Sequence, residues 1–450
     1  MESGTTKIVA VVVVVVIIVS GVGIYFLLKD NSSRELLSVS LEVYGNANGD
    51  WTIDEKDIEH IEKIISGEHE ATPFADANCD GVIDQKDIEQ VRVLANGTAK
   101  KVWFLDGLGV QVEVRCDPQR IYAFQVQNAE IACIMGVGDK VVAGGPPIEY
   151  YADFLFPGQK STMTFVASDY EVLATLDLDM YLVFGPAQKA APAERLPGVD
   201  VVYFGLYEPD TANLESSSWG QGILKAGYVF NCKERAEGYL NFLLEIRDKI
   251  KSATDNIPND KRVSVLTSGY SDYLKNADVK TMTVYLKSDT ISQAVALAGA
   301  KNVAESLSVW NGSTYSVVAD VEQLTEWDID WITMHYNYYE WTGLSVDNPA
   351  GGYTIKDPSE MYDAIDKVST RPLLSNVNSD HLILLPQEFR NGSNGGILCA
   401  AYLAKAFYPD RFAGFDPDSY MKEFLEEWLG IKNYNFDEHD AFIAYGLMRG

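Results

Sequence analysis

The chain has 450 residues, of which 47% are apolar, and carries a formal charge of −29 at pH 7. A chain of this length buries a large core, and we expect two or three domains. Its surplus of carboxylates repels a phosphate backbone, which excludes nucleic acid as a partner. The five cysteines are scattered without a C-x-x-C pair, so they signal neither a disulfide framework nor a zinc site.

The N-terminal segment contains an uncharged apolar run from Ile8 to Leu28. About 20 such residues suffice for a helix to cross the hydrocarbon core. The alternative is a cleaved signal peptide, which has a shorter apolar core and an A-x-A-like end. We predict a transmembrane anchor and a single-pass protein on the extracytoplasmic face of the cell membrane. Four N-x-S/T sequons agree with an exterior glycoprotein, and the acidic balance suits an archaeal cell surface.

After a polar linker, an acidic loop occurs twice, 30 residues apart, each time ahead of a helix. Oxygen-bearing side chains recur within each loop at the spacing with which proteins surround calcium, and the repetition disfavours a pair of ordinary acidic helix starts. Loop one runs from Asn46 to Asp57 and loop two from Asp76 to Asp87. Loop one has the neutral Asn46 where loop two has a carboxylate, and Trp51 where loop two has the turn glycine Gly81. We therefore expect loop two to bind calcium more tightly. The predicted ligands are Asn46, Asn48, Asp50, Thr52, Asp54 and Asp57 in loop one, and Asp76, Asn78, Asp80, Val82, Asp84 and Asp87 in loop two.

Two such loops, each leading into a single helix, make residues 41–98 resemble a dockerin module. The resemblance implies a calcium-binding plug that docks on a cohesin of a scaffold through loop positions 10 and 11. Here these are Glu55, Lys56, Gln85 and Lys86, unlike the serine/threonine pairs of the best-known dockerins. A cohesin partner therefore stays an open expectation.

From Lys101 the pattern changes to alternating strands and helices. Apolar residues at helical spacing predict a long, half-buried helix from Lys233 to Ala253. The segments 169–184 and 320–335 on either side of it share aspartate, glutamate and leucine at a constant offset, and each predicts a short helix, an Asp-x-Asp turn and a buried strand. The general likeness of helix-turn-strand units is one explanation. We favour two similar lobes joined by the helix.

The part beyond Lys101 also resembles the iron-complex and cobalamin family of ABC-transporter solute-binding proteins. An opening hairpin, a P-x-R-I entry and a helix before G-x-G-D-K-V-V carry the likeness, which continues in LAGAKNVAES and in the closing helices. The matching residues of the opening are Asp106, Gly109, Val112, Pro118, Arg120, Ile121, Glu130, Gly136, Gly138, Asp139, Lys140, Val141 and Val142. The resemblance implies a receptor, not an enzyme, that captures a siderophore-type iron complex, haem or cobalamin for an ABC permease and its ATPase.

The expected fold is α/β, with two Rossmann-like lobes joined by one long helix as in helical-backbone periplasmic binding proteins, behind a small α-helical dockerin and a transmembrane helix. The expected parts are an anchor (1–29), a linker (30–40), a dockerin-like domain (41–98), an N-terminal lobe (101–232), a connecting helix (233–256) and a C-terminal lobe (257–450).

The same resemblance assigns Glu171 and Glu322, one on each lobe, to docking on permease arginines. Ordinary helix-start acids favoured by the macrodipole are the alternative. The ligand cleft is expected at the C-terminal ends of the strands, where aromatic walls with a few polar groups suit a large, partly apolar ligand. The predicted ligand-binding residues are Tyr150, Tyr151, Phe165, Trp310, His335, Tyr336, Tyr338 and Arg390.

Two other functions stay open. In the first, the two-lobed part has lost its transport function, and the chain is a cell-surface scaffold or adhesion protein that acts through its dockerin-like segment. A carbohydrate-active enzyme is less favoured, because a glycosidase needs two carboxylates flanking one cleft and the expected cleft loops are aromatic.

Overall fold

The computed structural model describes residues 40–445, apart from 208, 276–279, 313, 337–351, 353–358, 372–373, 375–376, 433 and 435–443. Within this part of the chain no helix is long and apolar enough to cross a membrane. The longest, α8 (Lys233–Thr254), mixes charged residues with its apolar ones and packs inside the protein. The prediction of a single-pass membrane protein is therefore wrong for the described chain, and the expected anchor at residues 1–29 lies outside it.

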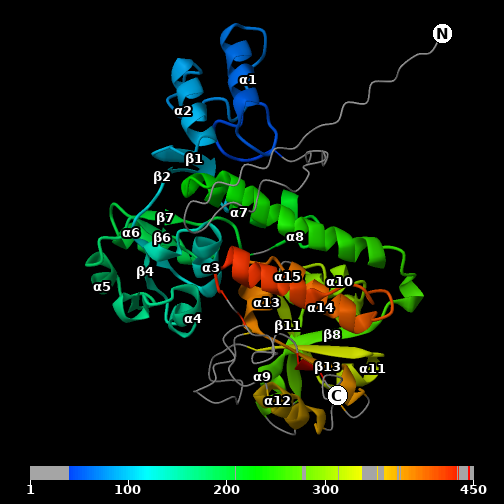
Figure 1. Ribbon diagram of the computed structural model, residues 1–450. Coiled ribbons are helices and arrows are strands. Elements are labelled where there is room, and N and C mark those ends of the chain that lie inside the picture. The colour runs from blue at the N-terminus through cyan, green and yellow to red at the C-terminus, as the bar shows by residue number, and fades with distance from the viewer. Residues whose placement is uncertain are drawn as a thin grey trace, which may run out of the picture. The chain divides into compact units, whose positions relative to one another are not determined.

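A small helical domain comes first and contains α1 (Glu55–Ile65) and α2 (Gln85–Ala95) (Figure 1). Each helix begins with a reciprocal capping box, in which the side chains of Asp54 and Asp57, or of Asp84 and Asp87, accept backbone N–H groups of the first turn. The predicted helix behind each acidic loop is thus present. Buried isoleucine and valine side chains pack the two helices together.

A hairpin of β1 (Lys101–Leu105) and β2 (Gln111–Arg115) leads into the N-terminal lobe. The lobe has a five-stranded parallel sheet in the order β5-β4-β3-β6-β7. The chain enters at the central strand and moves to one edge before it crosses to the other, which is a doubly wound arrangement. The strands are β3 (Ile121–Ala123), β4 (Val141–Gly144), β5 (Thr164–Phe165), β6 (Met180–Leu182) and β7 (Asp200–Val202), and the helices are α3 (Val126–Ile134), α4 (Ile148–Leu155), α5 (Tyr170–Ala174) and α6 (Ala190–Arg195).

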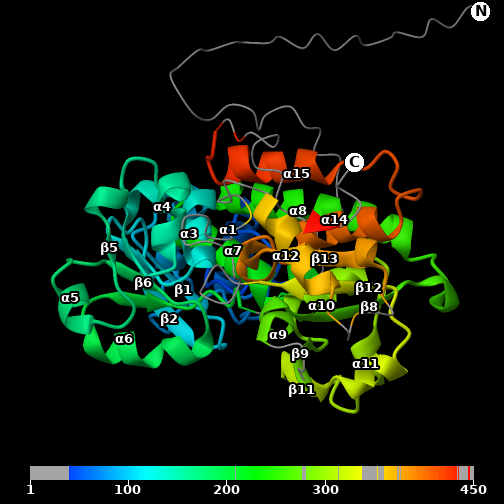
Figure 2. The same cartoon turned by 90° about the horizontal axis from the view of Figure 1, so that it is seen from below.

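Helices α7 (Ser218–Val229) and α8 pack against each other and carry the chain from one lobe to the other. The buried side of α8 contains Ala236, Leu240 and Leu243, which belong to the predicted helical pattern. The observed bounds of α8 agree with the predicted helix to within one residue. Helix α14 lies alongside α8 in both views of the molecule (Figures 1 and 2).

The C-terminal lobe is built on a mixed sheet, ordered β11-β9-β8-β12-β13-β14 with β10 beside β8. Strands β8, β10, β12 and β13 are parallel, whereas β9, β11 and β14 run antiparallel to their neighbours. The strands are β8 (Ser264–Gly269), β9 (Thr281–Tyr285), β10 (Lys301–Asn302), β11 (Ser316–Asp320), β12 (Trp331–His335), β13 (Leu382–Leu385) and β14 (Ala444–Tyr445). The helices are α9 (Tyr270–Lys275), α10 (Thr290–Leu297), α11 (Glu322–Glu326), α12 (Ser359–Ser369), α13 (Gln387–Asn391), α14 (Ile397–Phe407) and α15 (Pro417–Glu423).

The two similar segments, 169–184 and 320–335, adopt the predicted helix-turn-strand arrangement, as α5 with β6 and as α11 with β12. The last aspartate of each turn has the same role. Asp179 accepts the backbone N–H groups of Gln119 (2.8 Å) and Arg120 (3.0 Å) ahead of β3, and Asp330 accepts that of Ser264 (2.8 Å) at the start of β8. In each lobe this carboxylate joins one strand to its parallel neighbour, which accounts for the repeated pattern.

Candidate functional site

The short helix α13 follows β13 at the C-terminal edge of the second sheet and carries two charged residues, the buried Glu388 and the half-buried Arg390. Four of the predicted ligand-binding residues lie near this helix or belong to it: Arg390, His335, Tyr336 and Tyr151. They form two groups, one around Arg390 and one around Glu388.

The first group is a buried chain of polar contacts. Arg390 donates from Nε to Asp289 at 2.6 Å, and its guanidinium lies 4.6 Å from the ring centre of Tyr285. The Tyr285 hydroxyl is 3.1 Å from His335 Nδ1. Burial, reinforced by the charge of Arg390, lowers the pKa of His335 well below its usual value, so the imidazole is neutral. Its Nε2 is buried and has no hydrogen-bond partner among the described residues.

Arg390 itself is committed to the ion pair with Asp289, whose side chain is only 1% exposed. A guanidinium neutralised in this way offers a ligand less charge than a free one. The group therefore presents a neutral histidine nitrogen next to a compensated ion pair. Asp289 and Tyr285 were missed in the sequence, where nothing marks them as neighbours of residues 335 and 390.

The second group contains a buried carboxyl at the junction of the lobes. Glu388 is 4% exposed, and neither of its carboxyl oxygens forms a hydrogen bond of regular geometry within the described chain. Burial raises the pKa of Glu388 to about 8. The nearby backbone N–H groups of Glu388 and Gly352 and the Tyr151 hydroxyl offset part of this rise in pKa, and the charge of Glu130 adds to it. Tyr336 lies close enough for the charge of Glu388 to raise its own pKa, after burial as the main cause. Tyr151 and Glu130 come from the N-terminal lobe, and Glu388 and Tyr336 from the other.

Contacts between the lobes surround these groups. Glu130 accepts from the backbone N–H of Ser393 at 2.6 Å and from its hydroxyl at 2.8 Å. The ring of Tyr207 packs edge-on against Phe184 of its own lobe, 4.9 Å between centres, and against Tyr315 of the other lobe, 5.3 Å. Glu130 matched the family pattern in the sequence, but its partner is 263 positions away and has no local signal.

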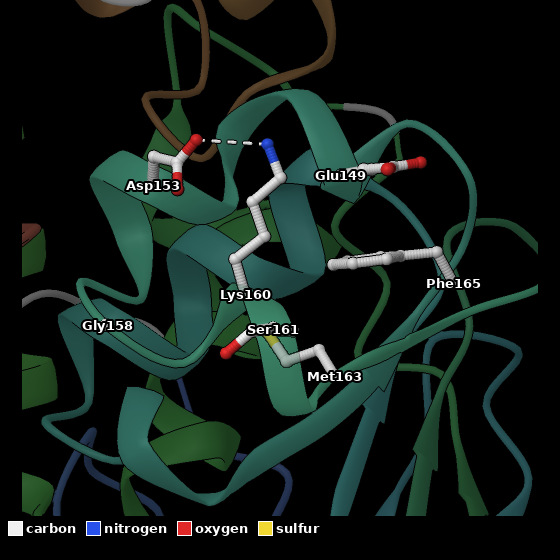
Figure 3. A pocket seen from close by; sticks show the side chains of 7 residues that line it. All are labelled: Glu149, Asp153, Gly158, Lys160, Ser161, Met163 and Phe165. Carbon is white, nitrogen blue, oxygen red and sulfur yellow. Dashed lines mark hydrogen bonds and ion pairs between the residues drawn. The ribbon is translucent and has the colours of Figure 1, made fainter.

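The remaining predicted ligand-binding residues are dispersed. Tyr150 is 39% exposed on α4, and Trp310 packs at the margin of the second core cluster of the C-terminal lobe. Phe165 lines a separate hollow of about 610 Å³ within the N-terminal lobe, together with Glu149 and Met163 and beside the 3.0 Å ion pair of Lys160 and Asp153 (Figure 3). Tyr338 lies outside the described residues. Tyr150, Phe165 and Trp310 are therefore not part of the two groups around Arg390 and Glu388.

Glu171 and Glu322 occupy corresponding places, in the first turns of α5 and α11, and both are exposed. Asp169 caps α5 by accepting the N–H of Val172 at 3.1 Å, so Glu171 is not needed as the cap.

The two acidic loops share one hydrogen-bond pattern. The backbone N–H of Asn48 donates to Asp57, and that of Asn78 to Asp87, both at 3.1 Å. Both aspartates are fully buried, and burial raises the pKa of Asp57 to about 7. No group of three or more His, Cys, Asp or Glu side chains in the described chain is arranged to hold a metal ion, so a cation in these loops would also need amide and backbone oxygens.

These loops contain such oxygens, and one is an unsatisfied atom. Asn46 is 1% exposed, and its Oδ1 has no hydrogen-bond partner in the part of the chain that is described. The residues present therefore fit a calcium ion. The argument that Trp51 strains loop one is wrong, because Trp51 does not adopt a positive φ. Loop one is left-handed at Gly49 (φ 76°), whereas loop two is left-handed at the corresponding Cys79 (φ 53°) and again at Gly81 (φ 87°).

Two α/β lobes bridged by a long helix, with polar side chains buried where the lobes meet, define a solute-binding receptor. A sequence model of the periplasmic binding protein family matches residues 137–384, and the chain belongs to that family. Members are solute-binding proteins of ABC transporters and not enzymes. No curated protein matches the chain.

Solved structures share the fold at low identity. The TroA-like periplasmic binding protein FepB from Veillonella parvula has a TM-score of 0.58 and 13% identity, covering 76% of this chain and 99% of its own. The molybdate periplasmic binding protein MolA of Haemophilus influenzae, bound to molybdate, has a TM-score of 0.54 and 17% identity, covering 73% and 98%. Helicobacter pylori CeuE with Ni(II) bound has a TM-score of 0.53 and 13% identity, covering 74% and 97%.

Proposed function

We propose that this chain captures a metal complex, such as an iron chelate, haem or a corrinoid, and delivers it to an ABC permease and its ATPase. The observation that carries the proposal is Glu388, a buried carboxyl without a hydrogen-bond partner, with Tyr151 and Tyr336 beside it at the junction of the lobes. An unsatisfied buried polar group costs free energy, which a ligand that brings positive charge or donors recovers.

The Glu388 carboxyl favours a cationic ligand over an oxyanion, because a bound cation can replace the proton that this carboxyl, with its pKa of about 8, holds in the folded protein. The solved relatives include one with Ni(II) bound and one bound to molybdate. In this chain Arg390 is already neutralised by Asp289, while Glu388 has no compensating cation in the described chain. An oxyanion would meet a carboxyl instead of a free guanidinium. Nε2 of the neutral His335, which has no hydrogen-bond partner among the described residues, adds a nitrogen of the kind that binds metal centres.

The test is a thermal-shift titration of the full chain with ferric chelates, haem, cobalamin and Ni²⁺, with molybdate as the oxyanion comparison. A ligand that binds only the folded protein raises its Tm in a saturable way. We expect one of the cationic or metal-complex ligands to do so, and Glu388→Gln to weaken that ligand at least tenfold. The matched control is Glu305→Gln, which changes an exposed glutamate. A well-folded protein that responds to none of them, or to molybdate alone, contradicts the proposal.

We further propose that Glu171 and Glu322 contact the permease. Their exposure and their corresponding positions in the two lobes support this role. Charge reversal of both residues to lysine is expected to leave ligand affinity unchanged and to abolish uptake with the cognate permease and ATPase. Unchanged uptake by the double variant contradicts the docking role.

We also propose that both loops of the small domain bind calcium and that this domain attaches to a surface partner such as a cohesin. Glu55, Lys56, Gln85 and Lys86, at the positions that recognise partners in dockerins, are all exposed. Isothermal titration with Ca²⁺ tests the first part, and calcium-dependent capture of purified cohesins tests the second. If attachment alone is found, with no solute bound, the scaffold function replaces transport. An enzymatic role is not proposed, because the family consists of solute-binding proteins.

A further inference from the structure

Loop one of the small domain is hydrogen-bonded to the helix pair that leads from one lobe to the other. The backbone N–H of Ile53 donates to the hydroxyl of Tyr228 on α7 at 2.7 Å, and its carbonyl accepts from Lys233 on α8 at 2.8 Å. The Thr52 hydroxyl donates to Glu237 on α8 at 2.6 Å. Ile53 is fully buried. Two consecutive loop residues are thus held by α7 and by the first turns of α8.

The rest of the small domain is also joined to the N-terminal lobe. Val43 pairs with Phe104 of β1, and Glu42 forms a 2.7 Å ion pair with Lys225 of α7, whose side chain is 1% exposed. Ile53 belongs to the same hydrophobic core cluster as Phe104 and as Leu240 of α8. A shared core predicts that the small domain and the receptor unfold together. In Figure 1 the small domain accordingly lies against β1 and α7.

The same loop contains one buried oxygen without a hydrogen-bond partner in the described chain. The amide of Asn46, at loop position 1, donates to the carbonyls of Leu41 at 2.8 Å and Asp50 at 2.6 Å, which leaves its Oδ1 buried and without a partner in the described chain. The corresponding residue of loop two, Asp76, accepts backbone N–H groups of its own loop with both oxygens, at 3.2 and 2.9 Å. Loop one therefore has the stronger need for a cation.

We propose that a calcium ion in loop one braces α7 and α8, so that calcium occupancy stabilises the solute-binding receptor itself. This inference rests on the calcium binding proposed above, and it reverses the expected order of importance of the two loops. Thr52 occupies loop position 7, where such loops contribute a backbone carbonyl to the ion. The ion and Glu237 then hold the same residue from two sides.

Loop two is placed differently. Val82, which corresponds to Thr52, is 58% exposed, and Asp80 and Lys86 form a 3.0 Å ion pair at the surface. Among the described residues, the side chains of loop two hydrogen-bond within the loop and the start of α2, as in the bonds of Asp76 to Asp80 and Gly81, and not to α7 or α8. The small domain is thus a fixed part of the receptor through loop one, while loop two faces solvent.

The experiment compares matched variants in the full chain, with Ca²⁺ and a chelator as the only additions. Asp57→Asn and Asp87→Asn change the same buried loop position in loops one and two. Calcium is expected to raise the Tm of a single unfolding transition by several degrees in the wild type and in Asp87→Asn, and to raise it little in Asp57→Asn. A larger loss in Asp87→Asn overturns the inference.

A second variant keeps the test valid if Asp57→Asn fails to fold. Thr52→Val removes the hydrogen bond to Glu237 and keeps the backbone carbonyl of the loop. We expect isothermal titration to show calcium binding at least about threefold weaker than in the wild type, together with a correspondingly smaller calcium-dependent rise in Tm, because a ligand stabilises the folded protein through its affinity for that state. Unchanged affinity with an undiminished rise overturns the coupling. Wild-type protein that binds calcium without any rise in Tm overturns this inference alone, whereas absence of binding overturns the proposed calcium function.

Discussion

The buried carboxyl of Glu388 makes stability depend on pH in a defined direction. Its pKa in the folded protein is about 8, well above the 4.5 of an unperturbed glutamate. Between these values the folded protein holds a proton that the unfolded chain has released. Stability is therefore greatest, as far as this group is concerned, below about pH 4.5, and falls as the pH rises toward 8.

The size of the effect follows from the two pKa values. Each pH unit in this window lowers the free energy of unfolding by up to about 1.4 kcal/mol. At pH 7 the loss is about 3 kcal/mol, and above pH 8 it reaches about 5 kcal/mol as an order of magnitude. The cause is the transfer of a charge into a buried site where Glu130 supplies a further negative charge and no cationic side chain of the described chain hydrogen-bonds to Glu388.

The variant Glu388→Gln isolates this contribution. Glutamine has a similar shape and does not ionise, so the variant loses this part of the pH dependence, while groups such as Asp57 contribute equally to both proteins. Thermal unfolding followed by tryptophan fluorescence at pH 5, 6, 7 and 8 is expected to show a Tm difference, variant minus wild type, that rises by several degrees with pH. Glu305→Gln is expected to show a constant difference. Parallel profiles for the wild type and Glu388→Gln would refute the reasoning.

Two further substitutions test the packing. Glu42→Gln is expected to destabilise the protein by about 1 to 2 kcal/mol, because it weakens the charge-assisted hydrogen bond of Lys225, whose side chain is 1% exposed while that of Glu42 is 43% exposed. Lys225→Met removes the buried charge itself and is expected to cost less. Equal losses for the two variants in urea unfolding would contradict this reasoning. Gly107→Ala places a Cβ 2.4 Å from the Cα of Gly205, so we expect the free energy of unfolding to fall by about 3 kcal/mol or more. Gly414→Ala, whose Cβ meets open space, is expected to change it little. Comparable Tm values for these two variants would contradict the close approach.

The sequence was most informative where a local pattern determines structure. Helix α8 was located to within one residue because its apolar positions recur at helical spacing over 22 residues. The helix-turn-strand structure of segments 169–184 and 320–335 was predicted correctly, because their aspartates lie next to the strand ends that they join. The mixed direction of the second sheet was not foreseen, since the apolar runs of β9 and β11 do not reveal which way a strand pairs.

The site was predictable only in part. His335 and Arg390 lie at strand and helix positions that pointed toward a cleft, but the residues that decide their chemistry were missed. Asp289 neutralises Arg390 from 101 positions away, and Glu130 approaches Glu388 from the other lobe. Sequence spacing contains no information on such pairings. Aromatic composition was a poor guide to the residues near Glu388, because Phe165 lines a separate hollow and Tyr150 is exposed on α4.

Under the calcium binding proposed above, the two acidic loops illustrate why ligand type alone ranks binding sites poorly. By side chains loop two is better equipped, since Asp76 carries a charge that Asn46 lacks. The positions that follow the loop turn are isoleucine in both repeats, Ile53 and Ile83, yet only Ile53 is fully buried against the receptor. The free energy of binding a cation includes what the ion fixes beyond its own ligands, and at loop one that is the start of the helix connecting the lobes. A neutral ligand in a loop that supports the receptor then contributes more to stability than a charged ligand in a loop that faces water.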